Sequence, residues 1–237
     1  MTMPHPGMGD PGAPFDSAAL ARLIAAQDHP WLAKLAVATA DVGSTPAPLW
    51  PGEDAAVVRA VPHRRAEFAA GRSAARAALA QLGEPPAAIP AGPDRAPIWP
   101  RGVVGSISHA GAVAIAVAAR IADSGIAALG VDVEPDRPLS PDLIGDIADD
   151  AEIARLAPLP PPVAALRIFS LKEAAYKAQY PLTRQLLGFH DLRLTPDGLV
   201  FAHAVPPFTA GALLPAQQWV GGGLCLSLCL LEVADTP

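Results

Sequence analysis

The sequence has 237 residues, is 51% apolar and carries a formal net charge of −6, from 17 Lys and Arg against 23 Asp and Glu. This length and apolar content allow a buried core in one larger domain or in two small joined halves. The negative charge argues against a protein that wraps nucleic acid, because counterion-releasing contacts need a surplus of Lys and Arg on one face. There is no apolar run as long as the ~18 residues of a membrane span and no signal-peptide pattern at the N-terminus, so we expect a cytoplasmic protein that does not bind membranes.

The first half of the chain predicts a mixture of helices and strands. Residues 1–16 hold Pro, Gly and polar side chains with little to pack, so we expect them to be frayed. The clearest element is a helix over Pro62–Leu82, which opens on a proline, is rich in alanine and is followed by Gly83. A turn at His109-Ala110-Gly111 separates two strands. One short helix and three strands complete this half: Ser17–Ala26, Lys34–Ala40, Val103–Ser108 and Val113–Arg120.

The second half also mixes helices and strands. A strand over Ile126–Val133 is closed by Pro135 and Pro138, and helical segments follow near Asp142–Leu156. The proline run Pro158–Pro162 precedes a second strong helix, Val163–Tyr180. Further strands are expected near Asp191–Leu194, Leu199–Ala204 and Leu224–Val233. This mixed order favours an α+β fold over an alternating doubly wound one.

The only two cysteines, Cys225 and Cys229, lie in the short apolar run GLCLSLCLLEV. On a strand they would stand about 13 Å apart, too far for a disulfide bond. The segment offers no further ligands for a metal. We therefore expect both to be buried, reduced thiols.

Two acidic residues end the strand GVDVEP. Asp132 and Glu134 are two residues apart, so their side chains point to the same side of an extended chain. Such a pair suits a hard cation such as Mg²⁺, which binds carboxylates together with phosphates and water. A solvated strand edge is the simpler alternative. In the second long helix, Glu173 and Lys177 share one face, where an ordinary surface ion pair is the alternative to a functional site.

Two further patterns predict an anion site. Gly105-Ser106-Ile107-Ser108-His109 brings a hydroxyl and an imidazole beside backbone N–H groups, which can hold phosphate oxygens but can also merely end a strand. In the first long helix, Arg65, Arg72 and Arg76 share one face among small alanines, and Arg forks recognise phosphate bidentately. The alternative for these arginines is a solvated face with snorkelling stems.

Each of these patterns is modest alone, but their order and spacing resemble a known family. The blocks PHRRAEFAAGRSAARAAL, PIWPRGVVGSISHA, GVDVEP and FSLKEAAYKAQYPLT are similar to those of the Sfp-type phosphopantetheinyl transferases, closest to the branch of enterobactin synthase component D. The resemblance covers Pro62 to about Phe189. It implies an α+β fold with pseudo-twofold symmetry, made of two similar α/β halves, residues 1–125 and residues 126–237, with the magnesium site in the second half.

The resemblance also implies roles for individual residues. It assigns Mg²⁺ to Asp132, Glu134 and Glu173, with Glu173 also the general base for the incoming serine. Lys177 would contact the pyrophosphate of coenzyme A, and Lys172 belongs to the same motif of cofactor-binding residues. The remaining residues implied to hold phosphate groups of coenzyme A are Ser108, His109, Arg65, Arg72, Arg76 and Arg95, and His109 is also counted with Glu173 and Lys177 in the catalytic set.

The implied activity is that of a holo-[acyl-carrier-protein] synthase. It moves the 4′-phosphopantetheine arm of coenzyme A onto a serine of an apo acyl or peptidyl carrier protein and releases 3′,5′-ADP, for nonribosomal peptide, polyketide or siderophore synthesis. We expect a monomer that binds coenzyme A and Mg²⁺ in the cleft between its halves. A magnesium-dependent phosphohydrolase and a non-catalytic coenzyme A-binding module are the two alternatives.

Overall fold

A computed structural model of the chain describes residues 15–43 and 47–236. They fall into two compact units, of which the first ends at Ile126 and the second begins at Ala127. The prediction for residues 1–16 lies outside these ranges apart from Phe15, which is buried, and Asp16, which caps the first helix. No helix among the described residues has the length and apolar character that crossing a membrane requires. Both units combine helices with antiparallel strands, so the α+β class is confirmed.

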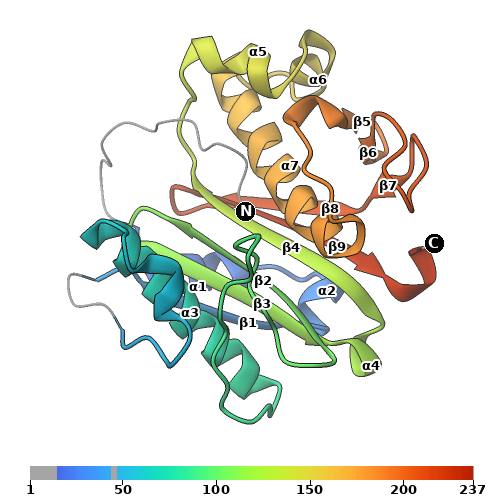
Figure 1. The fold of residues 1–237 in the computed structure, drawn as a ribbon. Coiled ribbons are helices and arrows are strands. Elements are labelled where there is room, and N and C mark those ends of the chain that lie inside the picture. The colour runs from blue at the N-terminus through green and yellow to red at the C-terminus, as the bar shows by residue number, and fades with distance from the viewer. Residues whose placement is uncertain (1–14, 44–46, 237) are drawn as a thin grey trace. The chain divides into compact units, whose positions relative to one another are not determined.

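The first unit is a three-stranded antiparallel sheet with one long helix packed on it (Figure 1). Strand β3 lies between β1 and β2, and helix α3 packs against all three strands. Short helices complete the unit. The elements are α1 (Ser17–Ala25), α2 (Pro30–Ala33), β1 (Ala36–Asp41), η1 (Asp54–Val57), α3 (Pro62–Gln81), β2 (Val103–Ala110), β3 (Val113–Arg120) and α4 (Ile121–Ser124).

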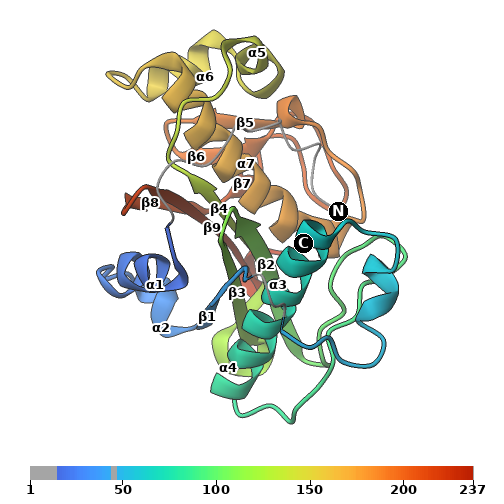
Figure 2. The same ribbon diagram turned by 90° about the vertical axis from the view of Figure 1, so that its left-hand side faces the viewer.

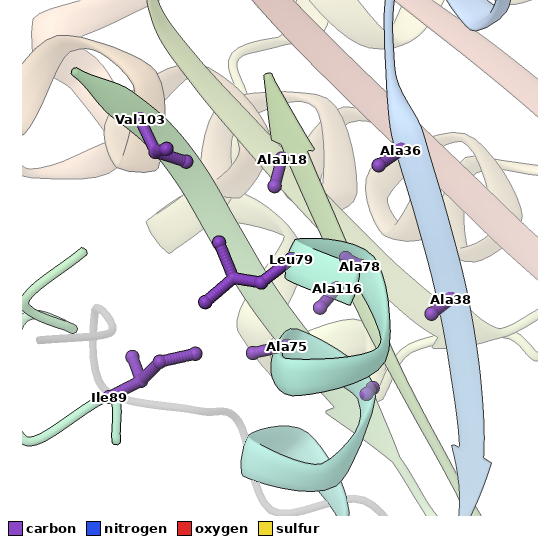
Figure 3. Packing of buried hydrophobic residues seen from close by; sticks show 10 residues of the cluster. Ala36, Ala38, Ala75, Ala78, Leu79, Ile89, Val103, Ala116 and Ala118 are labelled. Atoms are coloured by element: carbon purple, nitrogen blue, oxygen red, sulfur yellow. The ribbon is translucent and has the colours of Figure 1, made fainter. Parts of the chain in front are cut away.

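The core of this unit is built largely from alanines, which explains how closely the helix approaches the sheet. Figure 3 shows the alanines of α3 beside those of β1 and β3, with the larger side chains of Leu79, Ile89 and Val103 in the same cluster. Small side chains on both surfaces let backbones come close without cavities. Gly71 of α3 continues this pattern, because a Cβ there would lie 2.9 Å from Cγ2 of Ile107.

The second unit has two three-stranded sheets and one long helix (Figure 2). In its larger sheet β9 lies between β4 and β8, and helix α7 packs against β8 and β9. The smaller sheet is the antiparallel series β5, β6 and β7. The elements are β4 (Ile126–Pro135), η2 (Pro141–Leu143), α5 (Ile144–Ile147), α6 (Asp150–Arg155), α7 (Pro161–Thr183), η3 (Phe189–Asp191), β5 (Leu192–Thr195), β6 (Gly198–Phe201), β7 (Leu213–Leu214), β8 (Ala216–Gly221), β9 (Leu224–Glu232) and η4 (Val233–Asp235).

The two units share a chain path. Each begins its sheet with one strand, passes through a long helix and returns as two further strands, of which the last lies in the centre: β1, α3, β2, β3 in the first unit and β4, α7, β8, β9 in the second. The smaller sheet of the second unit is inserted between α7 and β8. Two units with the same path are what a duplicated architecture requires.

Most expected elements are present, and four details differ from the expectation. Strand β2 continues through His109 to Ala110, because the hairpin turn uses only Gly111, with φ 55°, and Ala112. Strand β4 includes Glu134 and ends at Pro135. Helix α7 begins inside the proline run, since a proline fits the first helical turn, where no N–H partner is needed. Strands β7 and β8 were not expected, whereas the helical segments expected near Asp142–Leu156 are present as three short helices. Cys225 and Cys229 are buried and free, as predicted.

Candidate active site

Asp132 and Glu134 lie near the end of β4 and are nearly inaccessible, with 3% and 2% of their surface exposed. Their backbone is extended, so the two side chains share one side of the strand. Burying a carboxylate costs free energy unless hydrogen bonds or an opposite charge compensate it. The simpler alternative of a solvated strand edge therefore does not hold for this pair.

Glu173 and Lys177 lie one turn apart on α7 and project from the face that meets β4. Glu173 is buried, with 2% of its surface exposed. The ammonium of Lys177 donates to the backbone carbonyl of Val131 at 3.1 Å and to Oδ1 of Asp132 at 2.7 Å. The contact between helix and strand depends on Gly130, because a Cβ there would lie 2.0 Å from the carbonyl oxygen of Ala174. A glycine in β4 thus brings the residues of α7 to those of the strand.

The electrostatics of Lys177 link all three carboxylates. Burial alone would lower the pKa of its ammonium, but the negative charges of Asp132, Glu173 and Glu134 outweigh burial and raise that pKa. Lys177 is therefore charged at neutral pH. Asp132 contacts Lys177, and the charges of Glu173 and Glu134 also act on it, so this group of residues has an excess of negative charge.

The donor chemistry of this group suits Mg²⁺, which prefers carboxylate oxygens. The arrangement is not that of a complete metal site, however. Over residues 15–43 and 47–236, no three His, Cys, Asp or Glu side chains are grouped so that they could hold a metal ion. One oxygen of Asp132 is instead engaged by the ammonium of Lys177.

Lys172 is placed away from this group. Its side chain is fully buried, and its ammonium lies 2.8 Å from Oε1 of Glu152 and 2.8 Å from the carbonyl oxygen of Ile147. Burial lowers the pKa of Lys172, and Glu152 acts in the opposite direction. These contacts hold Lys172 inside the second unit, and its predicted role in binding coenzyme A stays a prediction.

The first unit presents a second cluster, around the arginines of α3. The guanidinium of Arg72 lies over the ring of Phe68 at 4.1 Å and is buried, with 5% of the residue exposed. Its Nε has no hydrogen-bond partner within the described part of the chain. Burial lowers the pKa of Arg72 to about 10, while Glu53 opposes this and the neighbouring arginines Arg76 and Arg64 add to it. Arg72 is therefore a buried cation with unused donor capacity, which is the character of an anion-binding residue.

Arg76 is held by the protein itself. Its Nη1 donates to Oε2 of Glu53 at 2.6 Å, its Nη2 donates to the carbonyl of Pro48, and its guanidinium lies 4.9 Å from the ring of Trp50. Glu53 is completely buried and also accepts from the backbone N–H groups of Trp50 and Ile89. This carboxylate therefore joins the loop before α3 to the helix.

His109 meets Arg64 rather than Arg65. Its Nε2 lies 2.5 Å from Nη1 of Arg64, and its Nδ1 lies 3.5 Å from Oε1 of Glu67. Arg65 instead donates to the carbonyl of Val57 at 3.2 Å. Adjacent residues on a helix point about 100° apart, so only one of the two arginines can face β2.

The last two expected phosphate contacts occupy different settings. Ser108 is buried in β2, opposite Ile115 of β3. Arg95 is exposed in a tight loop, where its backbone has a left-handed φ of 66° and its N–H donates to the carbonyl of Gly92.

The sequence reasoning missed three residues of these clusters. Arg64 and Glu67 could have been found from the helical spacing that places them on one face, since Arg64 pairs with Glu67 at 3.1 Å. Glu53 lies in a loop and carries no pattern that sets it apart from other acidic residues. Its importance comes from contacts with residues distant in the sequence.

Comparison with known protein families assigns both halves of the chain. Residues 52–119 match the model of the 4′-phosphopantetheinyl transferase N-terminal domain. Residues 128–205 match the model of the 4′-phosphopantetheinyl transferase superfamily. The first match contains α3 and β2, and the second contains β4 and α7, so the matched regions hold both clusters.

Curated proteins give the same result. The chain is 43% identical to 4′-phosphopantetheinyl transferase Svp of Streptomyces mobaraensis over 73% of this chain and 69% of that protein. It is 40% identical to 4′-phosphopantetheinyl transferase Npt of Nocardia iowensis over 75% of this chain and 80% of that protein. Enterobactin synthase component D of Salmonella typhi is 36% identical over 62% of each chain.

Proposed function

Because this chain belongs to the 4′-phosphopantetheinyl transferase superfamily, we propose that its two clusters act together in moving phosphopantetheine from coenzyme A to a carrier protein. The chain is a 4′-phosphopantetheinyl transferase, and coenzyme A is its substrate. The acceptor is a serine of an apo carrier protein, and the second product is 3′,5′-ADP. The burial of Asp132, Glu134 and Glu173, together with the contact between Asp132 and Lys177, is the observation that carries the assignment of the chemistry to the second unit.

Glu173 accepts the proton of the attacking serine in this proposal. Its carboxylate is buried, and a carboxylate serves as a general base when it lies within hydrogen-bond reach of the reacting hydroxyl. Lys177 supplies a positive charge where negative charge accumulates on the phosphate groups in the transition state. Its raised pKa keeps that charge in place at neutral pH.

Asp132, Glu134 and Glu173 are the residues that would hold Mg²⁺. When bound, the ion would neutralise the charge of the pyrophosphate oxygens that develops as the phosphate bond breaks. The excess of negative charge in this group supports the assignment. Lys177, which lies beside Asp132, would contact the pyrophosphate.

Arg72 and the adjoining pair Arg64 and His109 would bind the 3′-phosphate of coenzyme A. Support comes from the unused donor of the buried Arg72 and from the positive charge of Arg64 and Arg76, which acts on Arg72. Arg76 contributes indirectly in this proposal, because Glu53 already holds it. Ser108 and Arg95 remain predicted phosphate contacts.

The experiment that tests this function measures transfer of labelled phosphopantetheine from coenzyme A to a panel of purified apo carriers, read as a mass shift. Omission of Mg²⁺ and the change Glu134→Ala should each abolish transfer. The first removes the ion that would neutralise the pyrophosphate, and the second removes one of the carboxylates that would hold the ion. Full activity in either case would contradict the assigned site. Release of 3′,5′-ADP at the same rate with and without a carrier would instead indicate a phosphohydrolase.

Several finer assignments belong to the same proposal. The carriers would be those of peptide, polyketide or siderophore assembly, in keeping with the enterobactin synthase component D similarity. The second domain, residues 126–237, would carry the metal, and the protein would act as a cytoplasmic monomer without nucleic acid. The carrier panel tests which carriers are modified, and a measurement of molecular mass in solution tests the monomeric state.

A further inference from the structure

Glu152, in the first turn of α6, carries a set of contacts that the transfer reaction does not explain. Its carboxylate is buried, with 3% of the side chain exposed, and lies in the second unit. It accepts hydrogen bonds from the backbone N–H groups of Leu194 at 2.8 Å and Asp149 at 3.1 Å. Together with the ion pair to Lys172, these contacts join α6, β5 and α7 through one side chain.

The ion pair between Glu152 and Lys172 is enclosed. Lys172 has no exposed surface, and its third contact, to the carbonyl of Ile147, adds the end of α5 to the network. Ile147, Ile168 and Phe169 of the same unit are buried in one apolar cluster, while the charges of Asp149 and Arg193 also act on Lys172. Removing two charges from water costs several kcal/mol per ion, so a buried pair is a poor way to gain stability alone. The better physical reason for the pair is that it favours one arrangement of α5, α6 and α7 over others.

Lys172 precedes Glu173 directly on α7, and Lys177 follows one turn later. Successive residues differ by about 100° around a helix, so Lys172 faces the α5 and α6 side while Lys177 faces β4. Apolar side chains of α7 such as Ile168 and Phe169 also pack with residues of α5 and α6, but apolar contacts are not directional. The ion pair of Lys172 adds a directional contact on the side of α7 that lies away from Lys177.

We infer that Glu152 is a positioning residue, which fixes the rotation of α7 through Lys172 and so sets where Glu173 and Lys177 stand relative to β4. The inference rests on the proposed function of Glu173 and Lys177. Lys172 thus acts inside the protein rather than on coenzyme A. Loss of the pair should lower turnover more than the affinity for coenzyme A, because the arginine cluster of the first unit, which would hold the 3′-phosphate, is not touched.

The test compares two changes of the full-length protein. Glu152→Gln keeps the shape but leaves the Lys172 ammonium without its counter-charge. The double variant Glu152→Leu with Lys172→Met replaces the pair by apolar side chains, which is often neutral or stabilising. Misplacement of a catalytic group by about 1 Å can cost about 100-fold, so we expect kcat to fall by about 10- to 100-fold in both variants. KM for coenzyme A should change less than about twofold.

Hydrogen exchange provides a measurement that needs neither substrate nor metal. Amides of Ala174 to Lys177 should exchange faster in both variants, while thermal unfolding shows that each variant is folded at the assay temperature. Glu84→Gln is the matched control, because it removes the carboxylate of the more exposed pair with Arg120 in the first unit. Its kcat should equal that of the unchanged protein.

A folded double variant with unchanged kcat would overturn the inference, because the pair would then act on stability alone. A lowered kcat without faster exchange in α7 would also overturn it, since the effect would not pass through the helix. An unchanged protein that transfers nothing to any carrier would contradict the proposed function itself. The two failures are therefore distinguishable.

Discussion

Helices α3 and α7 occupy the same place in the chain path of their units but present different chemistry. The functional side chains of α3 are arginines, held beside Phe68, Trp50 and the buried Glu53. Those of α7 are Glu173 and Lys177, which meet the carboxylates of β4. The same path of strand, helix and two strands therefore carries a cationic cluster once and a mainly anionic cluster once. In the proposed function the first unit would bind the 3′-phosphate of coenzyme A, and the second unit would carry the chemistry.

The contacts of α3 and α7 with their sheets also differ, in where the glycine at the contact lies. In the first unit the glycine lies on the helix, and Gly71 faces the side chain of Ile107. In the second unit the glycine lies on the strand, and Gly130 faces the backbone of α7. A side chain can move aside, whereas a helical backbone cannot without losing hydrogen bonds. We therefore expect a larger side chain to be tolerated less at the contact of α7 with its sheet than at the contact of α3 with its sheet.

The largest expected effect tests the proposed division of roles through a change in the second unit. Glu173→Gln removes the proposed general base and should lower kcat by about 10²–10⁴-fold, because proton transfer by a positioned group contributes about that much. KM for coenzyme A should change little. Steady-state kinetics with a saturating apo carrier measure both. Asp146→Asn, an exposed acidic residue of α5, is the control and should leave kcat unchanged. A Glu173→Gln variant that keeps more than half of its kcat would break the comparison.

The next effect concerns the two glycines. Gly130→Ala should destabilise the protein by at least about 3 kcal/mol, because its Cβ would fall 2.0 Å from a backbone oxygen of α7 and 2.6 Å from the nitrogen of Ala178. Gly71→Ala should cost less than about 1 kcal/mol, since alanine favours the helix and Ile107 can shift. Urea unfolding measures both changes.

Gly145→Ala is the matched control for the glycine pair. A Cβ there would meet nothing within 4 Å, and the residue is helical, so the protein should be unchanged or stabilised by about 0.5–1 kcal/mol. Equal destabilisation by the Gly71 and Gly130 changes would contradict the difference in packing.

A smaller effect tests the first unit as the ligand-binding half. Arg72→Lys keeps the charge but loses the planar fork, and a hydrogen bond to a charged group is worth about 1.5–3 kcal/mol. We expect KM for coenzyme A to rise about tenfold or more with kcat nearly constant. With 3′-dephospho-coenzyme A as substrate, the variant and the unchanged protein should have similar KM values. An equal rise with both substrates would place Arg72 elsewhere than at the 3′-phosphate.

The smallest effect concerns the thiols of β9, which take no part in either cluster. Burial raises the pKa of Cys225 and Cys229 to about 12. At pH 8 both should therefore resist a thiol reagent in the folded protein and react after denaturation. Because the unfolded thiols ionise near pH 9 and the folded ones do not, their contribution to stability is present below pH 9 and is lost as the pH rises towards 12. Rapid labelling of the native protein at pH 8 would contradict this.

Local patterns were sufficient to predict the long elements of the fold. Alanine content and proline or glycine at the ends indicate α3, and the apolar run before Glu232 indicates β9. The prolines before α7 led to a wrong helix start. Proline interrupts a helix when it lies in the interior but is favourable in the first turn. Strand β8 was missed because its Gln217-Gln218 pair lacks a clear alternation, and its pairing with β9 is a long-range property.

The site could be predicted less completely than the fold. The motifs identified Asp132, Glu134, Glu173 and Lys177, whose grouping needs only one strand and one helix in contact. Arg64 and Arg65 cannot be told apart by neighbouring sequence, since the choice depends on which side of α3 meets β2. Lys172 shares its motif with Lys177 but turns to the other side of the helix.

The stack of Arg76 on Trp50 gives the first unit an optical reporter. A guanidinium 4.9 Å from an indole changes the polarity around that ring, and Glu53 holds the arginine in place. A ligand whose negative charge interacts with Arg76 should therefore alter the fluorescence emission of Trp50. Titration of coenzyme A against the unlabelled protein, with Trp50→Phe as a blank, would then report occupancy in real time without radioactivity or a carrier.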